Sequence, residues 1–480
     1  MSESTFIYEN RGKYQARMMP NVPGKLKYGR TFLIGLAFML CTIFWEYYNF
    51  MMPLLLRDFF TDMGIAIGSD TLVGVVMVLD NIVAIFMLPY FGALSDRTKS
   101  KHGKRSPYII IGVSSATVAF SVIGLISSSR GVAVFVGLIA VIMWFNLSMA
   151  FFRSAAVSLM PDLTDPKVRP TGNGIINLFG AISMILGLGI RTITGKLFPD
   201  NLDLSRSSGF YILSLIAAIT LLIYIITVKE TPTGDKFLEI GKHNIAIDPI
   251  TLEYLGEQES AKKEPLLAAM KKIFTDKDKS TFYMLLVIFF WFFGFNALRT
   301  FYSLFATYSL GLSEGEASTV LMITPAVMII FVIFAGKIAE KIGRKRTIFI
   351  GLIGLSICLL VMPFLSGIIS LMILFGTVGI FYGMINVNTI VIMWEKAPKG
   401  MIGALTGAYY LASQLSDTLS PVIAGGVFDL YRLITDCPDG QQYNILFYYA
   451  IFFELLAMFF LSRVKGGEAP GFEDNYTEEN

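Results

Sequence analysis

The sequence predicts an all-α integral membrane protein whose twelve transmembrane helices form two six-helix pseudo-repeats. Of its 480 residues, 54% are hydrophobic and 16% are charged, whereas roughly 25% are charged in soluble domains. Apolar stretches of about 18 or more residues recur along the chain, and each is long enough to cross a hydrocarbon layer of roughly 30 Å as a helix. A basic motif occurs once in each half of the chain, which indicates that the halves are repeats.

Apolar runs bounded by charges or turn residues predict six helices, a polar break and six more helices. The runs lie near residues 31–56, 71–94, 107–129, 131–160, 173–195, 208–228, 281–309, 315–338, 346–366, 368–394, 401–428 and 443–463. The expected parts are a cytoplasmic N-terminal segment (1–30), two six-helix bundles (31–228 and 281–463), a cytoplasmic central linker (229–280) and a cytoplasmic acidic tail (464–480). The linker is expected to be hydrated, with one amphipathic helix around EPLLAAMKKIF (264–274).

Lysine and arginine residues accumulate in alternate loops. They are concentrated in the N-terminal segment, in the loop at 92–108, in the linker and in the loop at 336–347, and the loops in between carry far fewer. Because basic residues gather on the cytoplasmic side of short loops, we expect a multi-pass protein of the cell membrane with both termini in the cytoplasm. The first apolar run begins too late for an ordinary signal peptide, so it is expected to remain as a membrane helix.

The cysteines, histidines and net charge exclude several kinds of site. Cys41 and Cys358 lie inside apolar runs and Cys437 lies in a polar loop, so we expect no disulfide. His102 and His243 lie in loops, which leaves no material for a His-rich metal site or a His-centred triad. The net charge of +3 does not indicate nucleic-acid binding. We therefore expect no metal, no cofactor, no nucleic-acid partner and no enzymatic activity.

The basic motif resembles a loop of a known superfamily. Residues 92–108 read GALSDRTKSKHGKRSPY and residues 336–347 read GKIAEKIGRKRT, at positions that imply parallel repeats related by an axis along the membrane normal. The first copy resembles the cytoplasmic loop between helices 2 and 3 of the major facilitator superfamily, and the second copy matches it less fully. The resemblance implies the major facilitator fold and a cytoplasmic gate formed by Gly92, Asp96, Arg97, Gly103, Arg105, Glu340 and Arg344. Topological anchoring is the alternative role of the motif.

Two stretches resemble a narrower family. Residues 89–112 and 151–187 are similar to the glycoside-pentoside-hexuronide:cation symporters, and within them to the sucrose and proton-coupled sugar branch. Melibiose-type members hold a sodium ion with two aspartates on helix 2, where this chain has Ala84 and Leu88. The resemblance therefore implies a sugar carrier that couples to protons, with sodium the less expected ion.

Ionisable residues inside the apolar runs mark the candidate site. The runs contain Glu46, Asp80, Arg153, Arg191, Arg299, Glu395, Asp417 and Glu454. Such charges cost a few kcal/mol each at membrane depth, so they are expected to face water, a ligand or one another. Glu46, Asp80 and Asp417 each lie 16 residues from the inner end of their helix, which is about 24 Å at a rise of 1.5 Å per residue. We expect Glu46 and Asp80 to couple proton movement, and Glu454 to be structural. A buried salt bridge without a transport role is the alternative for the first two.

Polar residues at helical spacing predict the faces that line a central cavity. The candidates for substrate binding are Trp45, Tyr48, Asn49, Asn146, Arg153, Asn177, Asn296, Arg299, Asn388, Gln414 and Asp417. Tyr47, Trp291 and Tyr410 are further candidates for a ring on which a sugar could lie. For each aromatic residue, helix or lipid packing is the alternative interpretation.

The predicted function is secondary active transport of a sugar with a proton. The expected substrate is a di- or oligosaccharide or a glucoside, carried by alternating access around one central site in a monomer within the lipid bilayer. Two alternatives stay open, namely a carrier of another substrate class, such as a lysolipid or an exported drug, and a sensor that binds sugar without transporting it.

Overall fold

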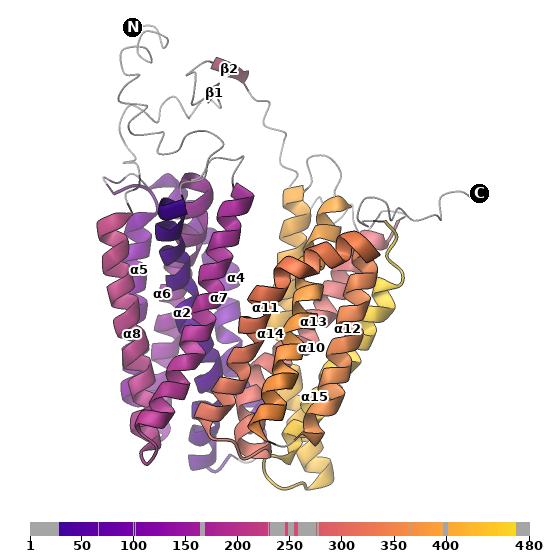
Figure 1. Ribbon diagram of the computed structural model, residues 1–480. Coiled ribbons are helices and arrows are strands. Elements are labelled where there is room, and N and C mark those ends of the chain that lie inside the picture. The colour runs from indigo at the N-terminus through magenta and orange to yellow at the C-terminus, as the bar shows by residue number, and fades with distance from the viewer. Residues whose placement is uncertain are drawn as a thin grey trace, which may run out of the picture.

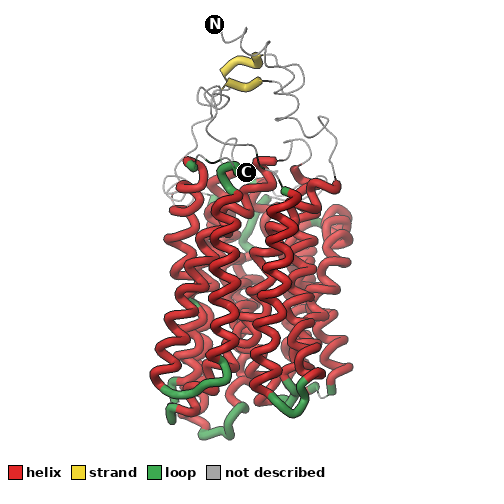
Figure 2. The backbone as a smooth tube through the Cα atoms, turned by 90° about the vertical axis from the view of Figure 1, so that its left-hand side faces the viewer, coloured by secondary structure: helices red, strands yellow, loops and turns green. Residues whose placement is uncertain are grey.

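The computed structural model describes most of the chain, and nearly all of it is helical. The described residues are 28–65, 67–98, 100, 102–163, 169–228, 230, 245–247, 254–257, 275, 278–365, 367–396 and 402–466. The predicted amphipathic helix at 264–274 lies outside them. Figure 2 shows helices that run nearly parallel along the whole height of the molecule, with a short strand pair beyond one end.

The first half of the chain contains the helices α2 to α8. They are α2 (Tyr28–Asp62), α3 (Ser69–Met77), α4 (Leu79–Arg97), α5 (Ser106–Ile126), α6 (Val132–Leu163), α7 (Arg169–Leu197) and α8 (Leu202–Thr227). The helix predicted at 71–94 is thus two segments, α3 and α4, which meet at Val78. Together they correspond to one membrane span.

The second half repeats the arrangement. Its helices are α10 (Ser280–Leu304, followed by a π-helical turn at Phe305–Ser309), α11 (Glu314–Ile342), α12 (Arg344–Val361), α13 (Ile368–Glu395), α14 (Ile402–Thr435) and α15 (Ile445–Leu461). Short 3-10 turns lie at Met362–Phe364 and Gln441–Asn444. In the linker range, β1 (Ile245–Ile247) and β2 (Tyr254–Glu257) pair as antiparallel strands.

Eleven spans in the described residues are long and apolar enough to cross a membrane. The remaining long helix, α14, has 34 residues but carries three charged side chains, Asp417, Asp429 and Arg432, along with several hydroxyl and amide groups. The outer surface of the bundle is apolar, with exposed side chains such as Leu215, Ile226 and Phe452, as expected of helices that face lipid. The predicted all-α, twelve-helix membrane fold is confirmed.

The two halves pack mainly within themselves and meet along three helix pairs. The most extensive cross-half contacts are those of α7 with α11, α3 with α14 and α2 with α10. The first two pairs are equivalent, because each joins the fifth helix of one half to the second helix of the other. We call the end where α8 finishes and α10 begins the linker side, which is uppermost in Figure 1, and the opposite end the far side.

The closest approach of the halves is on the far side. A Cβ atom on Gly74 of α3 would overlap the main-chain oxygen of Pro421 in α14. A Cβ atom on Gly425 of α14 would overlap the main-chain oxygen of Asp70. Glycine at both positions therefore allows two helix backbones from different halves to touch, as small residues do at membrane helix interfaces.

Glu454 lies apart from the interface between the halves. It is fully buried in α15, where one carboxyl oxygen accepts a hydrogen bond of 2.6 Å from Ser356 of α12. The other carboxyl oxygen has no partner in the described part of the chain. Its position between two helices of one half agrees with the structural role expected from the sequence.

Removing the Ser356 hydroxyl is expected to destabilise this helix pair. In Ser356→Ala, the buried Glu454 loses its one hydrogen bond, so we expect the free energy of unfolding to fall by about 1–3 kcal/mol. Thermal unfolding in detergent measures the effect. Ser462→Ala is the matched control, since the exposed Ser462 hydroxyl bonds only to its own helix; equal melting temperatures of the two variants would contradict the prediction.

Candidate functional site

An ion pair at mid-depth joins the two halves. Glu46 of α2 accepts a hydrogen bond of 2.5 Å from Arg299 of α10. The Glu46 side chain is 9% exposed and that of Arg299 is 42% exposed, so the pair lies at the edge of a space rather than inside packed protein. The sequence predicted both residues for the site, and the structure brings them into contact.

A second charged group lies close to this pair. Asp80 is in the first turn of α4, directly after the break at Val78, where the helix N-terminus favours an acidic side chain. Asp80 interacts electrostatically with Asp417 of α14, with Arg153 of α6 and with Arg299. Asp80, Asp417, Arg153 and Arg299 are thus within electrostatic range of one another, and with Glu46 we call them the central cluster.

Asn81 connects α4 to α14 within this cluster. Its side-chain oxygen accepts a hydrogen bond of 2.6 Å from Gln414, and its amide group donates one of 3.3 Å to the main-chain oxygen of Asp417. Gln414 and Asp417 are predicted site residues, but Asn81 was missed. The available signal was a second polar residue beside Asp80 in an apolar run.

A cavity of about 200 Å³ opens beside the Glu46–Arg299 pair. Most of its wall comes from the C-terminal half and is apolar, with Phe295, Met328 and Tyr382 among the lining residues. Two polar groups of the wall are already hydrogen-bonded within the protein, because Thr324 donates to the main chain at Phe375 and Tyr302 donates to that at Ala317. The cavity can therefore accept an apolar group next to an ion pair.

Several buried polar atoms in the described residues have no hydrogen-bond partner, and predicted site residues are prominent among them. They include Trp45 Nε1, Tyr48 OH, Asp80 Oδ1, both amide atoms of Asn146, Trp291 Nε1 and Asn296 Nδ2. A buried polar atom without a partner costs about 1–3 kcal/mol, so native proteins rarely keep a group of them. Such a group indicates a place that takes up water or a hydroxyl-bearing ligand.

The other predicted substrate residues lie in different surroundings. Asn49 is half-buried, and Asn388 is buried and donates to the main chain of its own helix at Met384. Asn177 belongs to α7, but its side chain lies outside the described part of the structure. Contact of these three residues with a substrate therefore stays a prediction.

One aromatic candidate was wrong as a sugar platform. Tyr47 is fully buried and donates a hydrogen bond of 2.8 Å to the main chain at Arg206. Tyr410 is 60% exposed and lies one helical turn before Gln414 on α14, so its contact with a sugar stays a prediction. Trp291 is fully buried, and its ring lies 5.5 Å from that of Tyr382 in the cavity wall.

The first basic motif forms a compact network on the linker side. Arg105 forms ion pairs with Asp96 and with Asp162, the latter at 2.9 Å. Glu230, after α8, accepts hydrogen bonds from the main-chain N–H groups of Lys104, Arg105 and Ser106. Gly103 has φ +91°, and a side chain there would overlap Glu230. All described partners of Arg105 come before the linker strands in the chain, so none of them belongs to the C-terminal half.

Gly92 joins that network through Ser95, which accepts from Arg105 and donates to the Gly92 main chain; the other gate candidates lie elsewhere. Gly92 lies next to Ser154 of α6, while Arg97 and Glu340 are exposed. Arg344 pairs with Glu395 at 3.3 Å on the linker side. The sequence placed Glu395 among the charges of the cavity; this was wrong, because Glu395 is the last residue of α13 and reaches the end of the bundle.

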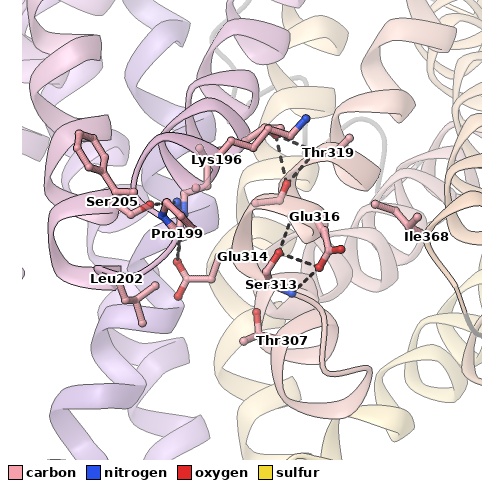
Figure 3. A pocket seen from close by; sticks show the side chains of 15 residues that line it. Lys196, Pro199, Leu202, Ser205, Thr307, Ser313, Glu314, Glu316, Thr319 and Ile368 are labelled. Carbon is pink, nitrogen blue, oxygen red and sulfur yellow. Dashed lines mark hydrogen bonds and ion pairs between the residues drawn. The ribbon is translucent and has the colours of Figure 1, made fainter.

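Two charged residues from just outside the predicted runs meet a third on the far side. Arg191, expected in the cavity, instead contacts Glu314 on the far side, and Arg206 contacts the same carboxylate. Figure 3 shows Glu314 beside a pocket of about 630 Å³ between α7, α8 and α11. The sequence signal for this contact was a pair of opposite charges, because Arg206 comes just before the predicted run 208–228 and Glu314 just before 315–338.

The described residues contain no group of three or more His, Cys, Asp and Glu side chains suited to a metal ion. The central cluster instead combines carboxylates, guanidinium groups and amides, which can bind hydroxyl groups and hold or release a proton. It lies where the two halves meet, as a carrier site requires.

Comparison with known proteins identifies the family. The Major Facilitator Superfamily profile matches residues 34–421. The chain is 21% identical to Multidrug resistance protein 2 of Bacillus subtilis over 59% of this chain and 64% of that protein. It is 25% identical to the cis,cis-muconate transport protein of Acinetobacter baylyi (58% and 62%) and 26% identical to Sucrose transport protein SUC4 of Arabidopsis thaliana (31% and 33%). The matches thus span less than two thirds of each relative.

Solved structures show the same fold at low identity. The nucleoside transporter NupG superposes with a TM-score of 0.62 at 14% identity, over 91% of this chain and 99% of that one. A D-xylose-proton symporter superposes with a TM-score of 0.63 at 14% identity, over 90% and 95%. With a family profile that covers most of its length and this shared fold, the chain belongs to the Major Facilitator Superfamily and is a membrane transporter rather than an enzyme.

Proposed function

We propose that the protein is a sugar:proton symporter of the glycoside type, which carries a di- or oligosaccharide or a glucoside by alternating access. The observation that carries the proposal is the set of buried, unpartnered polar atoms on α2, α4, α6 and α10, the helices that carry Glu46, Asp80, Arg153 and Arg299. Hydroxyl groups of a sugar can both donate and accept hydrogen bonds, so one sugar ring would satisfy several of these atoms. The partial match to a plant sucrose transport protein supports the same substrate class.

The apolar cavity favours a substrate with a second, less polar part. Trp45, Tyr48 and Asn146 belong to the N-terminal half, while the 200 Å³ cavity is lined mostly by the C-terminal half. A glucoside would place its sugar against the polar atoms and its aglycone in the cavity. The residues of the proposed site all come from one chain, and we propose a monomer as the carrier.

The charges of the cluster suit a single coupled proton. Glu46, Asp80 and Asp417 supply three carboxylates, and Arg153 and Arg299 supply two guanidinium groups. One negative charge is left over, and one bound proton would neutralise it before the cluster is closed off from water. We assign the proton to Glu46 or Asp80, and sodium stays the less expected ion.

The proposed orientation places the linker side in the cytoplasm of a cell-membrane protein. The described basic residues of 92–108 and 336–347 lie at the helix ends and loops of that side, which agrees with the positive-inside rule. Since the halves touch most closely on the far side, this orientation makes the described state one that is closed to the outside.

Uptake into proteoliposomes tests the proposal. With a potential of about 100 mV, inside negative, one proton per sugar supports accumulation of about 50-fold. We expect labelled sucrose or a methyl or phenyl glucoside to accumulate to this order at low external pH and less at high external pH. Asp80→Asn is expected to bind the sugar but abolish accumulation, whereas Asp200→Asn, in an exposed loop, leaves it unchanged. If the wild type, Asp80→Asn and Asp200→Asn all accumulate the sugar equally at both external pH values, the proposal of proton coupling is wrong.

One observation favours a different substrate class. The apolar wall of the cavity suits an amphipathic or aromatic compound, and the relatives include a multidrug resistance protein and a muconate transport protein. Uptake of lysolipid, drug or dicarboxylate without any sugar uptake would favour this alternative. Sugar binding without accumulation would instead favour a sensor.

A further inference from the structure

A single carboxylate ties the two halves together on the far side. Glu314 is the first residue of α11 in the C-terminal half and is 5% exposed. It accepts hydrogen bonds from Arg191 of α7 at 2.8 and 3.1 Å and from Arg206 of α8 at 2.9 Å. Both arginines are almost fully buried in the N-terminal half. The carboxylate therefore lies between two guanidinium groups across the interface.

Neighbouring groups extend this contact. Arg206 also pairs with Asp58 of α2 at 2.6 Å, and Asp58 accepts a hydrogen bond of 3.0 Å from Tyr308 of the other half. Thr192 lies 2.9 Å from the Thr319 hydroxyl across the same interface. The Tyr308–Asp58 and Thr192–Thr319 bonds join the N-terminal half to the C-terminal half.

An equivalent acid stands at the same place in the other repeat. Asp70 is the second residue of α3 and is fully buried. It accepts hydrogen bonds from Tyr443 at 2.6 Å and from Gln442 at 3.2 Å. The second helix of each half thus begins with a buried acid that is held by the start of the sixth helix of the opposite half.

We propose that Glu314 and Asp70 are paired latches that keep the far side closed, with Glu314 the stronger of the two. Glu314 binds two permanently charged guanidinium groups, whereas the direct donors to Asp70 are a phenol and an amide. The proposal rests on the alternating-access part of the proposed function and is independent of the substrate.

The physical basis is the difference in hydration between the two states. In the closed state Glu314, Arg191 and Arg206 are buried together. Removing the carboxylate takes away the anion that both buried guanidinium groups bind, which is unfavourable. When the far side opens, the same arginines gain water and need no partner. Neutralising Glu314 therefore raises the free energy of the closed state more than that of the open state.

Distance measurements between spin labels test the latch in the full chain without substrate. Labels at Lys196→Cys and Ile369→Cys report on opposite halves at exposed far-side positions; Cys437→Ser removes the accessible native thiol, while Cys41 and Cys358 are buried. We expect Glu314→Gln to raise the ratio of far-side-open to closed molecules about tenfold or more. Glu316→Gln is the matched control, because Glu316 is exposed, lies two residues away and bonds only to Ser313.

A mild variant keeps the test decisive if Glu314→Gln does not fold. Tyr308→Phe removes only the hydroxyl that crosses to Asp58, so it should fold and shift the same distance distribution in the same direction by a smaller factor. Unchanged distributions in Tyr308→Phe and in any folded Glu314→Gln would overturn the latch. Failure of sugar uptake in the wild type would leave this result intact and would affect only the substrate assignment.

Discussion

Replacing Glu46 with glutamine is expected to reduce the initial rate of proton-driven substrate uptake about 100-fold. The substitution leaves the Arg299 guanidinium without its carboxylate at the junction of α2 and α10. Removing one partner of a buried ion pair costs about 3–5 kcal/mol. Because the Arg299 side chain is 42% exposed and water can solvate it, we expect a cost at the lower end of this range. A loss of about 3 kcal/mol corresponds to roughly 100-fold.

A double variant separates loss of the ion pair from loss of coupling. In Glu46→Gln with Arg299→Gln no unpaired charge remains, so we expect the melting temperature to recover while accumulation stays low. Initial uptake at two external pH values, normalised to folded protein, is the measurement. If the single variant concentrates substrate with an unchanged pH response, Glu46 has no part in coupling.

Gly425→Ala is expected to lower transport at least tenfold without unfolding the protein. The new methyl group would overlap the Asp70 main chain from the other half, and overpacking of this kind costs about 1–3 kcal/mol. The cost arises only when α3 and α14 are in contact, so it falls on the far-side-closed state. A carrier that cannot close on one side cannot complete its cycle.

Gly426→Ala is the matched control for this substitution. Its Cβ atom would lie 3.9 Å from the nearest atom outside its own helix, Thr71 Oγ1. Both variants gain similar helix propensity, up to about 1 kcal/mol, so the difference between them isolates the contact between the halves. Uptake rates that are equal in the two variants would show that the close approach at Gly425 is unimportant.

The helices were predictable from the sequence because membrane spans need long apolar runs. Their ends were less predictable. The first run was expected to end at residue 56, yet α2 continues to Asp62 through Arg57 and Asp58. These charges are satisfied by partners within the protein: Asp439 pairs with Arg57 at 2.5 Å, and Asp58 pairs with Arg206 and accepts a hydrogen bond from Tyr308. A charge marks the end of a span only when it faces water.

The site was predictable in its depth but not in its pairing. Counting residues from helix ends placed Glu46, Asp80 and Asp417 at one level because the rise per residue is constant. The partner of Glu46 is 253 positions away, at Arg299, and depends on how two helices are rotated about their axes. Arg206 and Glu314 were missed for the same reason, since their contact arises from the packing of separate halves.

The polarity of α14 has a consequence for biogenesis. Among the described long helices it is the one that fails the apolarity criterion for a span, so its transfer from the translocon into lipid as a lone segment would be unfavourable. Its main neighbours, α10, α3 and α13, all precede it in the chain. When α14 leaves the ribosome these helices are already in the bilayer, and they can shield its polar face as it inserts. A chain shortened or reordered so that α14 emerged first would lack that protection.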